Sequence, residues 1–274
     1  MGKKVALHNL GCKVNAYEVE AMQQLLEEAG YEIVPFEPGA DVYLINTCTV
    51  TNIADRKSRQ MLHKAKKMNP DAIVIAAGCY VQTDEGKLDK DEAVDLILGN
   101  NQKGNIVQVL EEYEQQHTKQ KHVLKINQTK EYEELAIDHT AEHVRAYIKV
   151  QDGCNQFCTY CIIPKIRGNY RSVPMETLIE QAKQLAEQGV RELILVAQET
   201  TIYGTDLYGK KSLHLLLKEL CKIPGIVWIR VLYCYPEEIY PELIETIRDE
   251  KKICHYLDLP IQHANDDILK RMGR

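Results

Sequence analysis

The chain has 274 residues, of which 45% are hydrophobic and 27% charged, and its formal net charge at pH 7 is −6. This composition fits one or two globular domains with apolar cores and excludes a disordered or fibrous chain. The longest apolar run, 72–81, is too short to span a membrane, and no charged leader precedes an apolar segment. We therefore expect a soluble cytoplasmic protein, whose nine cysteines indicate metal ligands or catalytic groups rather than disulfides.

Residues 1–114 alternate short apolar runs with helical patterns, which predicts an α/β domain: an open parallel sheet flanked by helices. The expected strands are 4–9, 42–46, 72–77 and 95–98. Asn15 and Glu18 resemble a capping box at the start of a first helix, which Gly30 ends. A second helix is expected over 53–68, before Pro70.

Residues 115–143 are polar and lack apolar periodicity, so we predict a linker there. The second domain, 144–274, has strands expected at 146–150, 192–197, 227–232 and 255–259, and helices at 175–188, 213–221, 236–249 and 266–272. This alternation predicts four βα units in a row, as in part of a βα barrel.

The segment CNQFCTYC places Cys154, Cys158 and Cys161 on one loop after the first strand of the second domain. This spacing differs from that of zinc-finger pairs and suits one iron–sulfur cluster. Three thiolates leave one iron open, which favours catalysis over simple electron transfer. A zinc site completed by a distant His or Cys is the alternative.

Three further cysteines each follow the carboxyl end of a predicted parallel strand: Cys12, Cys48 and Cys79. Such strand ends share one rim of an open α/β sheet, so these residues are expected to converge and could hold a second cluster. The alternative is three unrelated buried cysteines. Cys221 is expected in the core, and Cys234 and Cys254 fit no ligand motif.

The stretch QDGCNQFCTYCIIPKIRG resembles the cluster loop of radical S-adenosylmethionine enzymes. The resemblance implies that the open iron binds S-adenosylmethionine, whose reductive cleavage yields a 5′-deoxyadenosyl radical. Tyr160 matches the aromatic position beside the adenine, with a packing ring as the alternative. Gln198, Glu199 and Gln262 follow expected barrel strands and are candidate cofactor or substrate contacts, or else polar loop residues. No general base is assigned, because hydrogen abstraction by a carbon radical needs none.

Both cysteine sets together resemble the methylthiotransferase family of radical enzymes, over essentially the whole chain. The resemblance implies two 4Fe–4S clusters, with Cys12, Cys48 and Cys79 as auxiliary-cluster ligands and Cys154, Cys158 and Cys161 as radical-cluster ligands. It also implies a reductant such as flavodoxin or ferredoxin and a sulfur donor. In this family a C–S–CH3 group replaces a C–H bond.

The two parts of the chain resemble different branches of that family. NLGCKVNAYEVEAM and INTCTVTNIADRKSRQ resemble enzymes that methylthiolate threonylcarbamoyladenosine beside the tRNA anticodon. From about Pro164 onward, segments such as ELILVAQETTIYGTDLYG resemble enzymes that modify an aspartate of a small-subunit ribosomal protein. The resemblance implies tRNA as the substrate, with the ribosomal protein as the alternative. A non-catalytic iron–sulfur protein, or a zinc-stabilised RNA-binding protein, is the alternative of another class.

The expected helix over 53–68 is strongly cationic and carries candidate RNA-binding residues: Arg56, Lys57, Arg59, Lys64, Lys66 and Lys67. Ala54, Met61, Leu62, Ala65 and Met68 make its apolar side, so the cations are free to meet phosphates. A solvated charged face is the alternative. In the family about six βα units and a small RNA-binding domain would be expected, so we expect this chain to hold a C-terminally truncated part of the barrel, with an open edge at its last strand.

Overall fold

The computed structural model describes every residue except 1, 130–131, 134, 136 and 138–143. The chain forms two compact units. The first unit comprises residues 1–129, 133–135 and 165–167, and the second comprises residues 130–132, 136–164 and 168–274. None of the helices built from the described residues combines the length and the apolar character of a membrane-spanning segment.

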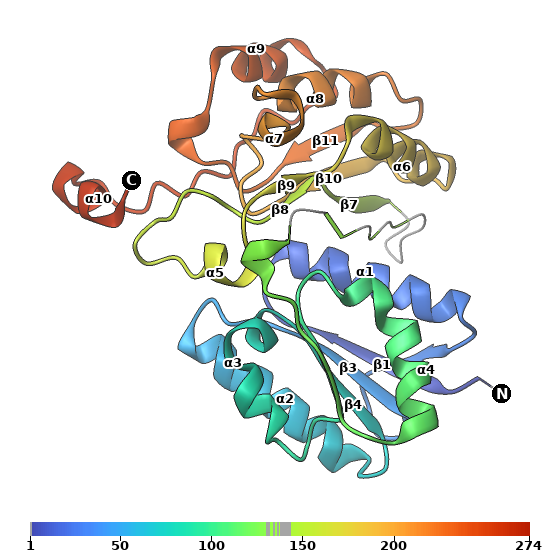
Figure 1. Ribbon diagram of the computed structural model, residues 1–274. Helices are drawn as coiled ribbons and strands as arrows, with labels where there is room; N and C mark the ends of the chain where they lie inside the picture. Colours follow the sequence, from blue (N-terminus) through green and yellow to red (C-terminus); the bar gives the residue numbers. More distant parts are fainter. Residues whose placement is uncertain (1, 130–131, 134, 136, 138–143) are drawn as a thin grey trace. The chain divides into compact units, whose positions relative to one another are not determined.

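A parallel sheet forms the centre of the first unit, with strand order β2-β1-β3-β4-β5-β6 (Figure 1). Its strands are β1 (Lys4–Asn9), β2 (Glu32–Val34), β3 (Val42–Thr47), β4 (Ile73–Gly78), β5 (Leu96–Leu98) and β6 (Gln120–His122). The four expected strands are confirmed as β1, β3, β4 and β5. The unpredicted β2 and β6 have three residues each and lie at the two edges, where little of the apolar signal of a central strand is needed.

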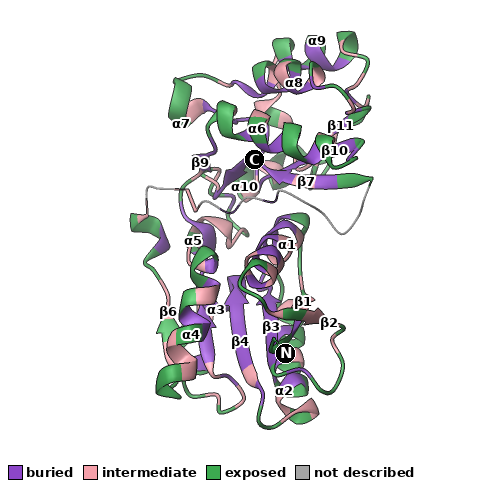
Figure 2. Ribbon diagram, turned by 90° about the vertical axis from the view of Figure 1, so that its right-hand side faces the viewer, coloured by how far each residue is buried: buried purple, intermediate pink, exposed green. Residues whose placement is uncertain are grey.

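Helices cover both faces of this sheet. Met22 and Leu26 of α1 (Lys13–Glu28) and Leu110 of α4 (Ile106–Gln116) pack with one set of strand side chains. Leu62 of α2 (Asn52–Met68) and Val81 of α3 (Cys79–Asp89) pack with the other set. The strands β3 and β4 are buried almost throughout (Figure 2), because both of their faces are covered. The expected open parallel sheet flanked by helices is confirmed.

The start of α1 differs from the expectation. The helix begins at Lys13, with Cys12 at the cap position and no capping side chain, so the predicted capping box is wrong. Asn15 and Glu18 lie inside the helix and are each 1% exposed. Their side chains bond to other segments, which is why the local pattern misled. The predicted second helix is confirmed as α2, where Thr51 caps the amino end by accepting from the Ala54 N–H at 3.1 Å.

The segment expected as a linker, 115–143, is partly built into the units. Its strand β6 pairs in parallel with β5, and a 3-10 turn spans Ile126–Gln128. Leu135 is 4% exposed, and its carbonyl accepts a hydrogen bond from the Tyr17 hydroxyl within the first unit. The linker prediction is therefore wrong for these residues, because edge pairing and isolated apolar anchors leave little periodic signal. The rest of the predicted boundary falls largely outside the described residues.

The second unit contains a parallel sheet of three strands, in the order β11-β10-β7. Its strands are β7 (Arg145–Lys149), β10 (Glu192–Val196) and β11 (Trp228–Val231), and a small antiparallel pair joins β8 (Gln151–Asp152) to β9 (Arg171–Ser172). The helices are α5 (Ile163–Arg167), α6 (Met175–Glu187), α7 (Thr205–Tyr208), α8 (Leu213–Cys221), α9 (Pro241–Asp249) and α10 (Asp266–Met272). A 3-10 turn over Pro236–Glu238 precedes α9, so the expected helix begins later than predicted.

The expected strand at 255–259 is wrong. The chain touches β11 only through an isolated bridge between Ile229 and Ile253, with a further hydrogen bond from the Cys234 N–H to the Asp258 carbonyl at 2.9 Å. Residues 255–259 are exposed or half-buried, so they lack the burial that stabilises an apolar run as a central strand. Three of the four expected strands are thus confirmed, and the described residues form no closed barrel.

Candidate metal centres

The first candidate centre lies at the carboxyl ends of three adjacent strands of the first unit. Cys12 follows β1, Cys48 follows β3 and Cys79 follows β4. The sulfurs of Cys12 and Cys79 each lie 3.9 Å from the same atom, Oδ1 of Asn15. The structure therefore brings these thiols together at one rim, as the strand pattern predicted.

Gly11 allows the close approach of Cys48 to this group. Its φ of +104° lies in the region that favours glycine, and a β-carbon there would sit 3.0 Å from the Cys48 sulfur and 3.1 Å from Nδ2 of Asn15. Ser58 of α2 fixes the Cys48 backbone, since its hydroxyl accepts from the Cys48 N–H at 3.1 Å and donates to the Cys48 carbonyl at 2.9 Å. The third thiol is thus held beside the other two.

A buried polar network supports the three thiols. Arg167 donates to both carboxylate oxygens of Glu18, from Nη1 at 2.6 Å and from Nη2 at 3.0 Å, and Nη2 also donates to Oδ1 of Asn15 at 2.8 Å. Lys103 donates to the same carboxylate and to Oδ1 of Asn100. All five side chains are at most 1% exposed. Such buried charges are stable only because they are paired and hydrogen-bonded.

Two members of this network also reach the thiols. Nη2 of Arg167 lies 3.6 Å from the Cys79 sulfur, and Nδ2 of Asn100 lies 3.9 Å from it. Desolvation raises the pKa of the Cys12 thiol, although the Arg167 charge partly offsets that effect. Burial also raises the pKa of the Cys48 thiol. Without a metal these two thiols are therefore held neutral, and metal binding would have to displace their protons.

The donor set fits an iron–sulfur cluster, because the gathered donors are soft thiols with hydrogen-bond donors around them. Among the described residues, no three His, Cys, Asp or Glu side chains are gathered tightly enough to hold a single metal ion. The fit at this rim therefore depends on the shared neighbours of the three thiols.

The candidate RNA-binding cations lie on α2, which starts close after Cys48. Its first turns, with Arg56 and Lys57, are at the rim end of the sheet, whereas Lys66 near the other end donates to the Ala72 carbonyl, ahead of β4, at 2.9 Å. Arg56, Lys57, Lys64 and Lys67 are exposed. Arg59 bonds to the Tyr80 hydroxyl at 3.0 Å, and Lys66 pairs with Asp95 at 3.0 Å. The six cations thus differ in how free they are to meet a phosphate.

The second candidate centre is the loop after β8, in the second unit. The loop leaves the strand at Gly153, whose φ is +84° and where a β-carbon would lie 2.2 Å from the Asn169 carbonyl oxygen. The Gly153 N–H donates to Oε1 of Gln198 at 2.7 Å and to Oδ1 of Asp152 at 2.9 Å. Gln198 therefore anchors the base of the loop that carries Cys154, Cys158 and Cys161.

A cavity of about 190 Å³ opens at this loop. It brings together every residue that the sequence predicted for this site: Cys154, Cys158, Tyr160, Cys161, Gln198, Glu199 and Gln262. Burial raises the pKa of Cys154 to about 11 and also raises that of Cys161. Nε2 of Gln198 is buried and, among the described residues, has no hydrogen-bond partner, so the cavity offers a free donor beside the thiols. This combination fits a cluster with a polar organic cofactor, although the roles of the residues stay predictions.

Glu199 is 2% exposed and accepts from the Thr201 N–H at 2.8 Å and from the Tyr235 N–H at 3.3 Å. Burial raises its pKa to about 7, against the opposing effect of these hydrogen bonds. Tyr160 is 50% exposed and Gln262 is also exposed. Glu199 is therefore a buried wall of the cavity, whereas Tyr160 and Gln262 belong to its open side.

Several residues of this cavity were not predicted. The Tyr235 hydroxyl lies 3.8 Å from the Cys158 sulfur, and the Arg274 guanidinium stacks on the Tyr235 ring, 3.7 Å from its centroid. The Thr159 N–H donates to the Met272 carbonyl at 3.0 Å, which ties α10 to the cysteine loop. Cys234 also lines the cavity, and its sulfur lies 3.5 Å from the Thr200 hydroxyl. The sequence YCYP around Cys234 gave no ligand spacing that could have placed it here.

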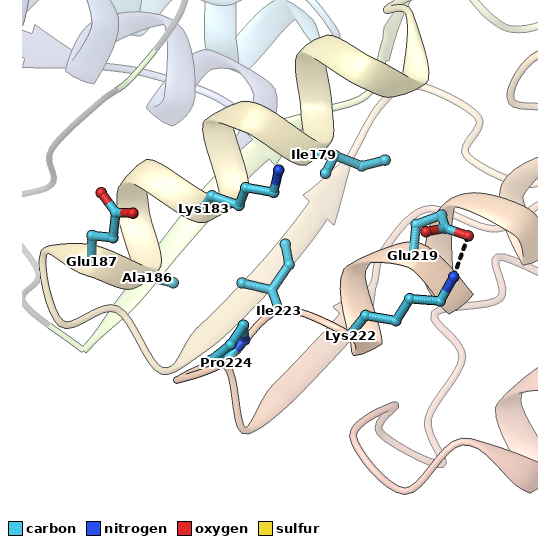
Figure 3. Close-up of a pocket in the computed structure, with 8 residues that line it drawn as sticks. All are labelled: Ile179, Lys183, Ala186, Glu187, Glu219, Lys222, Ile223 and Pro224. Atoms are coloured by element: carbon cyan, nitrogen blue, oxygen red, sulfur yellow. Dashed lines mark hydrogen bonds and ion pairs between the residues drawn. The ribbon is translucent and has the colours of Figure 1, made fainter.

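A second hollow of about 460 Å³ lies between α6 and α8 (Figure 3). Isoleucine, alanine and proline side chains line it, together with the ion pair between Lys222 and Glu219 at 2.7 Å. It contains none of the cysteines, so it offers no ligand set for a metal.

In the first unit the sequence missed Asn100, Lys103 and Arg167. Their signal was weak because each is a single polar residue in a loop or short helix, where a solvated side chain is the ordinary expectation. The motif PKIRG held Arg167 in plain view, but nothing local indicated that its guanidinium is buried against Glu18.

Comparisons with known proteins bear on both units. Residues 4–99 match the Uncharacterized protein family UPF0004, and residues 148–274 match the Radical SAM superfamily. The chain is 45% identical to "Ribosomal protein uS12 methylthiotransferase RimO" of Lachnoclostridium phytofermentans, over 99% of the chain and 62% of that relative. It is 40% identical to "Threonylcarbamoyladenosine tRNA methylthiotransferase MtaB" of Bacillus subtilis, over 98% of the chain and 60% of that relative. The chain thus spans about three fifths of the length of these curated relatives.

Solved structures show the same fold. The radical S-adenosylmethionine methyltransferase TsrM from Kitasatospora setae, with cobalamin and an iron–sulfur cluster bound, superposes with a TM-score of 0.64 at 15% identity, over 98% of this chain and 60% of that one. The cobalamin-dependent radical enzyme OxsB gives a TM-score of 0.61 at 10% identity, over 99% of this chain and 45% of that one. Taken with the relatives of 40% identity and more, both matched models and the two gathered sets of three cysteines, these findings assign the chain to the radical S-adenosylmethionine methylthiotransferase family.

Proposed function

We propose that this chain binds two 4Fe–4S clusters and S-adenosylmethionine and takes part in methylthiolating C2 of N6-threonylcarbamoyladenosine at position 37 of tRNA. Cys12, Cys48 and Cys79 would hold the first cluster, and Cys154, Cys158 and Cys161 the second. The observation that carries the proposal is that each unit gathers three thiols at one place, one set around Asn15 and the other around a polar cavity.

The residues of the second unit have distinct tasks in this proposal. When bound, the second cluster and S-adenosylmethionine supply the radical that removes a hydrogen atom from an unreactive carbon. Gln198 holds the cysteine loop through the Gly153 N–H and offers its free Nε2 to the cofactor. Glu199 and Cys234 close the inner wall against water, since both are at most 2% exposed.

Iron content tests the two-cluster proposal. After anaerobic reconstitution the chain should hold about twice the iron and sulfide of its C154A/C158A/C161A variant, and reduction with S-adenosylmethionine should release 5′-deoxyadenosine only while those three cysteines are present. C158A should abolish that product and leave the first set loaded. A colourless protein with stoichiometric zinc would contradict the proposal in favour of a zinc-stabilised RNA-binding protein.

Cys234 makes the distinction from a closed electron-transfer cluster. It lies in the same cavity as the three thiols, but its sulfur lies close to the Thr200 hydroxyl, and the free-ligand position belongs to the cofactor in this proposal. The C234A protein should therefore load the same iron and still form 5′-deoxyadenosine. Loss of iron at the second site in C234A, with no S-adenosylmethionine cleavage by the parent chain, would favour the electron-transfer alternative.

The tRNA assignment is supported by α2, whose exposed Arg56 and Lys57 start at the rim that carries Cys48. Cations at that position can hold phosphates while the modified base lies elsewhere. R56E/K57E should weaken tRNA binding about tenfold at low salt and flatten its salt dependence by about two phosphate contacts. The matched control K64E/K67E changes the same charge at the far end of the helix and should have a smaller effect. Equal losses in both variants would point to a solvated charged face.

A ribosomal-protein substrate is the second candidate. Relatives at 45% and 46% identity over 99% of the chain carry the name of the ribosomal protein uS12 methylthiotransferase. Mass spectrometry of tRNA nucleosides and of that ribosomal protein, from cells with and without the gene, separates the candidates. Loss of the methylthio group from the nucleoside supports the tRNA proposal, and loss from the protein aspartate contradicts it.

A further inference from the structure

We propose that Arg167 is a positioning residue of the first site: its guanidinium donates a hydrogen bond to the Cys79 sulfur and thereby raises the reduction potential of the cluster held there. The inference rests on the proposed function in one respect, namely that Cys12, Cys48 and Cys79 hold an iron–sulfur cluster.

The geometry of Arg167 is that of a directed donor. It is 1% exposed, and Glu18 engages both ends of its fork, so the planar group has a defined orientation. The same Nη2 atom lies 2.8 Å from Oδ1 of Asn15 and 3.6 Å from the Cys79 sulfur. Asn15 in turn donates from Nδ2 to the Leu10 carbonyl at 2.7 Å and to the Thr47 carbonyl at 3.0 Å, which fixes the acceptor between the thiols.

A hydrogen bond from a cation to a thiolate stabilises negative charge on the sulfur. Because reduction adds an electron to the cluster, a donor at a ligand sulfur favours the reduced form and raises the reduction potential. Burial strengthens the effect, since little water screens the guanidinium from Cys79. Arg167 therefore acts on the cluster through its ligand, without being a ligand itself.

Lys103 provides the matched comparison. It is 0% exposed and donates to the same Glu18 carboxylate, but its second partner is Asn100 rather than a thiol. A role confined to stabilising the buried network would make the two cations equivalent. A role through the thiol would separate them, because only Arg167 has a donor at Cys79.

The test uses the full chain with C154A/C158A/C161A, so that only the first site contributes iron signals. R167K keeps a positive charge beside Glu18 but loses the second arm of the fork, whereas K103M removes a charge that does not touch sulfur. In anaerobically reconstituted protein, R167K should lower the midpoint potential of the cluster and change its electron paramagnetic resonance spectrum at unchanged iron content. K103M should leave both close to those of the parent.

An unchanged potential in fully loaded R167K overturns the inference, and so does an equal shift in K103M, which would assign the effect to buried charge alone. If R167K fails to load, R167Q, which keeps a donor of similar reach without the charge, replaces it under the same two criteria. Absence of iron from the C154A/C158A/C161A parent would instead refute the first cluster, and with it the proposed function, so the two failures are distinguishable.

Discussion

Oε1 of Gln198 accepts a hydrogen bond from the Gly153 N–H at 2.7 Å, so the end of β10 holds the start of the cysteine loop. Replacing the amide with leucine leaves this N–H with Asp152 as its remaining acceptor. We expect Q198L to lower the free energy of unfolding by about 1 kcal/mol and to weaken S-adenosylmethionine binding. Urea unfolding and isothermal titration measure the two effects.

The control for Q198L is Q181L. Gln181 on α6 donates from its amide to the Ile137 carbonyl at 3.2 Å, away from the cysteine loop. Q181L should lower stability by a similar amount while cofactor binding stays unchanged. If both variants bind the cofactor equally well, Gln198 has no special role at the cavity.

Gly153 should tolerate no side chain. G153A combines a φ of +84° with a β-carbon 2.2 Å from the Asn169 carbonyl oxygen, where backbone must move. We expect a loss of more than about 3 kcal/mol in unfolding free energy, together with loss of iron at the second site. G189A is the matched control, because its φ is +98° but no atom lies within 4 Å of the added carbon. It should lose only about 1 kcal/mol, from backbone strain alone, and equal losses in the two alanine variants would contradict the steric argument.

Glu199 should make the metal-free protein less stable as pH rises. Its folded-state pKa is raised to about 7, so the folded state resists ionisation that the unfolded state undergoes near its ordinary value of 4.5. The contribution of Glu199 is therefore fully present below about pH 4.5 and is lost as pH rises through about 7, by roughly 3 kcal/mol. Urea unfolding at pH 5 and pH 8 should show this loss in the parent and a smaller one in E199Q.

E180Q controls for the removal of a carboxylate. Glu180 is an exposed residue of α6, with 62% of its side chain accessible and only a surface contact to Lys183. The difference between pH 5 and pH 8 should be the same in E180Q as in the parent. A parent protein with no such difference from E199Q would show that Glu199 is ionised in the fold at both pH values.

The buried carboxylate of Glu18 should be far more important for stability than a surface one. E18A leaves the Arg167 and Lys103 charges without the anion that both contact. Uncompensated buried charge lowers stability by about 3–5 kcal/mol, and thermal unfolding of the metal-free chain should show it. E219Q removes an exposed partner of Lys222 and should change stability by less than about 0.5 kcal/mol. A comparable loss in E219Q would contradict the buried-network account.

Local sequence was enough to predict most of the sheet and both cysteine sets. The runs at β1, β3 and β4 are continuous and apolar because both faces of those strands are covered, and that signal needs no knowledge of partners. Cys12, Cys48 and Cys79 could be placed at one rim because parallel strands end on the same side. The segment at 255–259 shows the limit of this reasoning, since an apolar run without burial formed no strand.

The sequence by itself therefore determined the α/β class and the three-thiol sets, because period and spacing are properties of adjacent residues. Only the tertiary structure decided that Asn15 and Glu18 bind across the molecule rather than cap a helix, and that Arg167 belongs to the first unit. Such pairings join residues far apart in the chain, and a buried arginine resembles a solvated one until its partner carboxylate is located. Packing, which no local pattern encodes, converted these polar residues from surface candidates into the support of a thiol site.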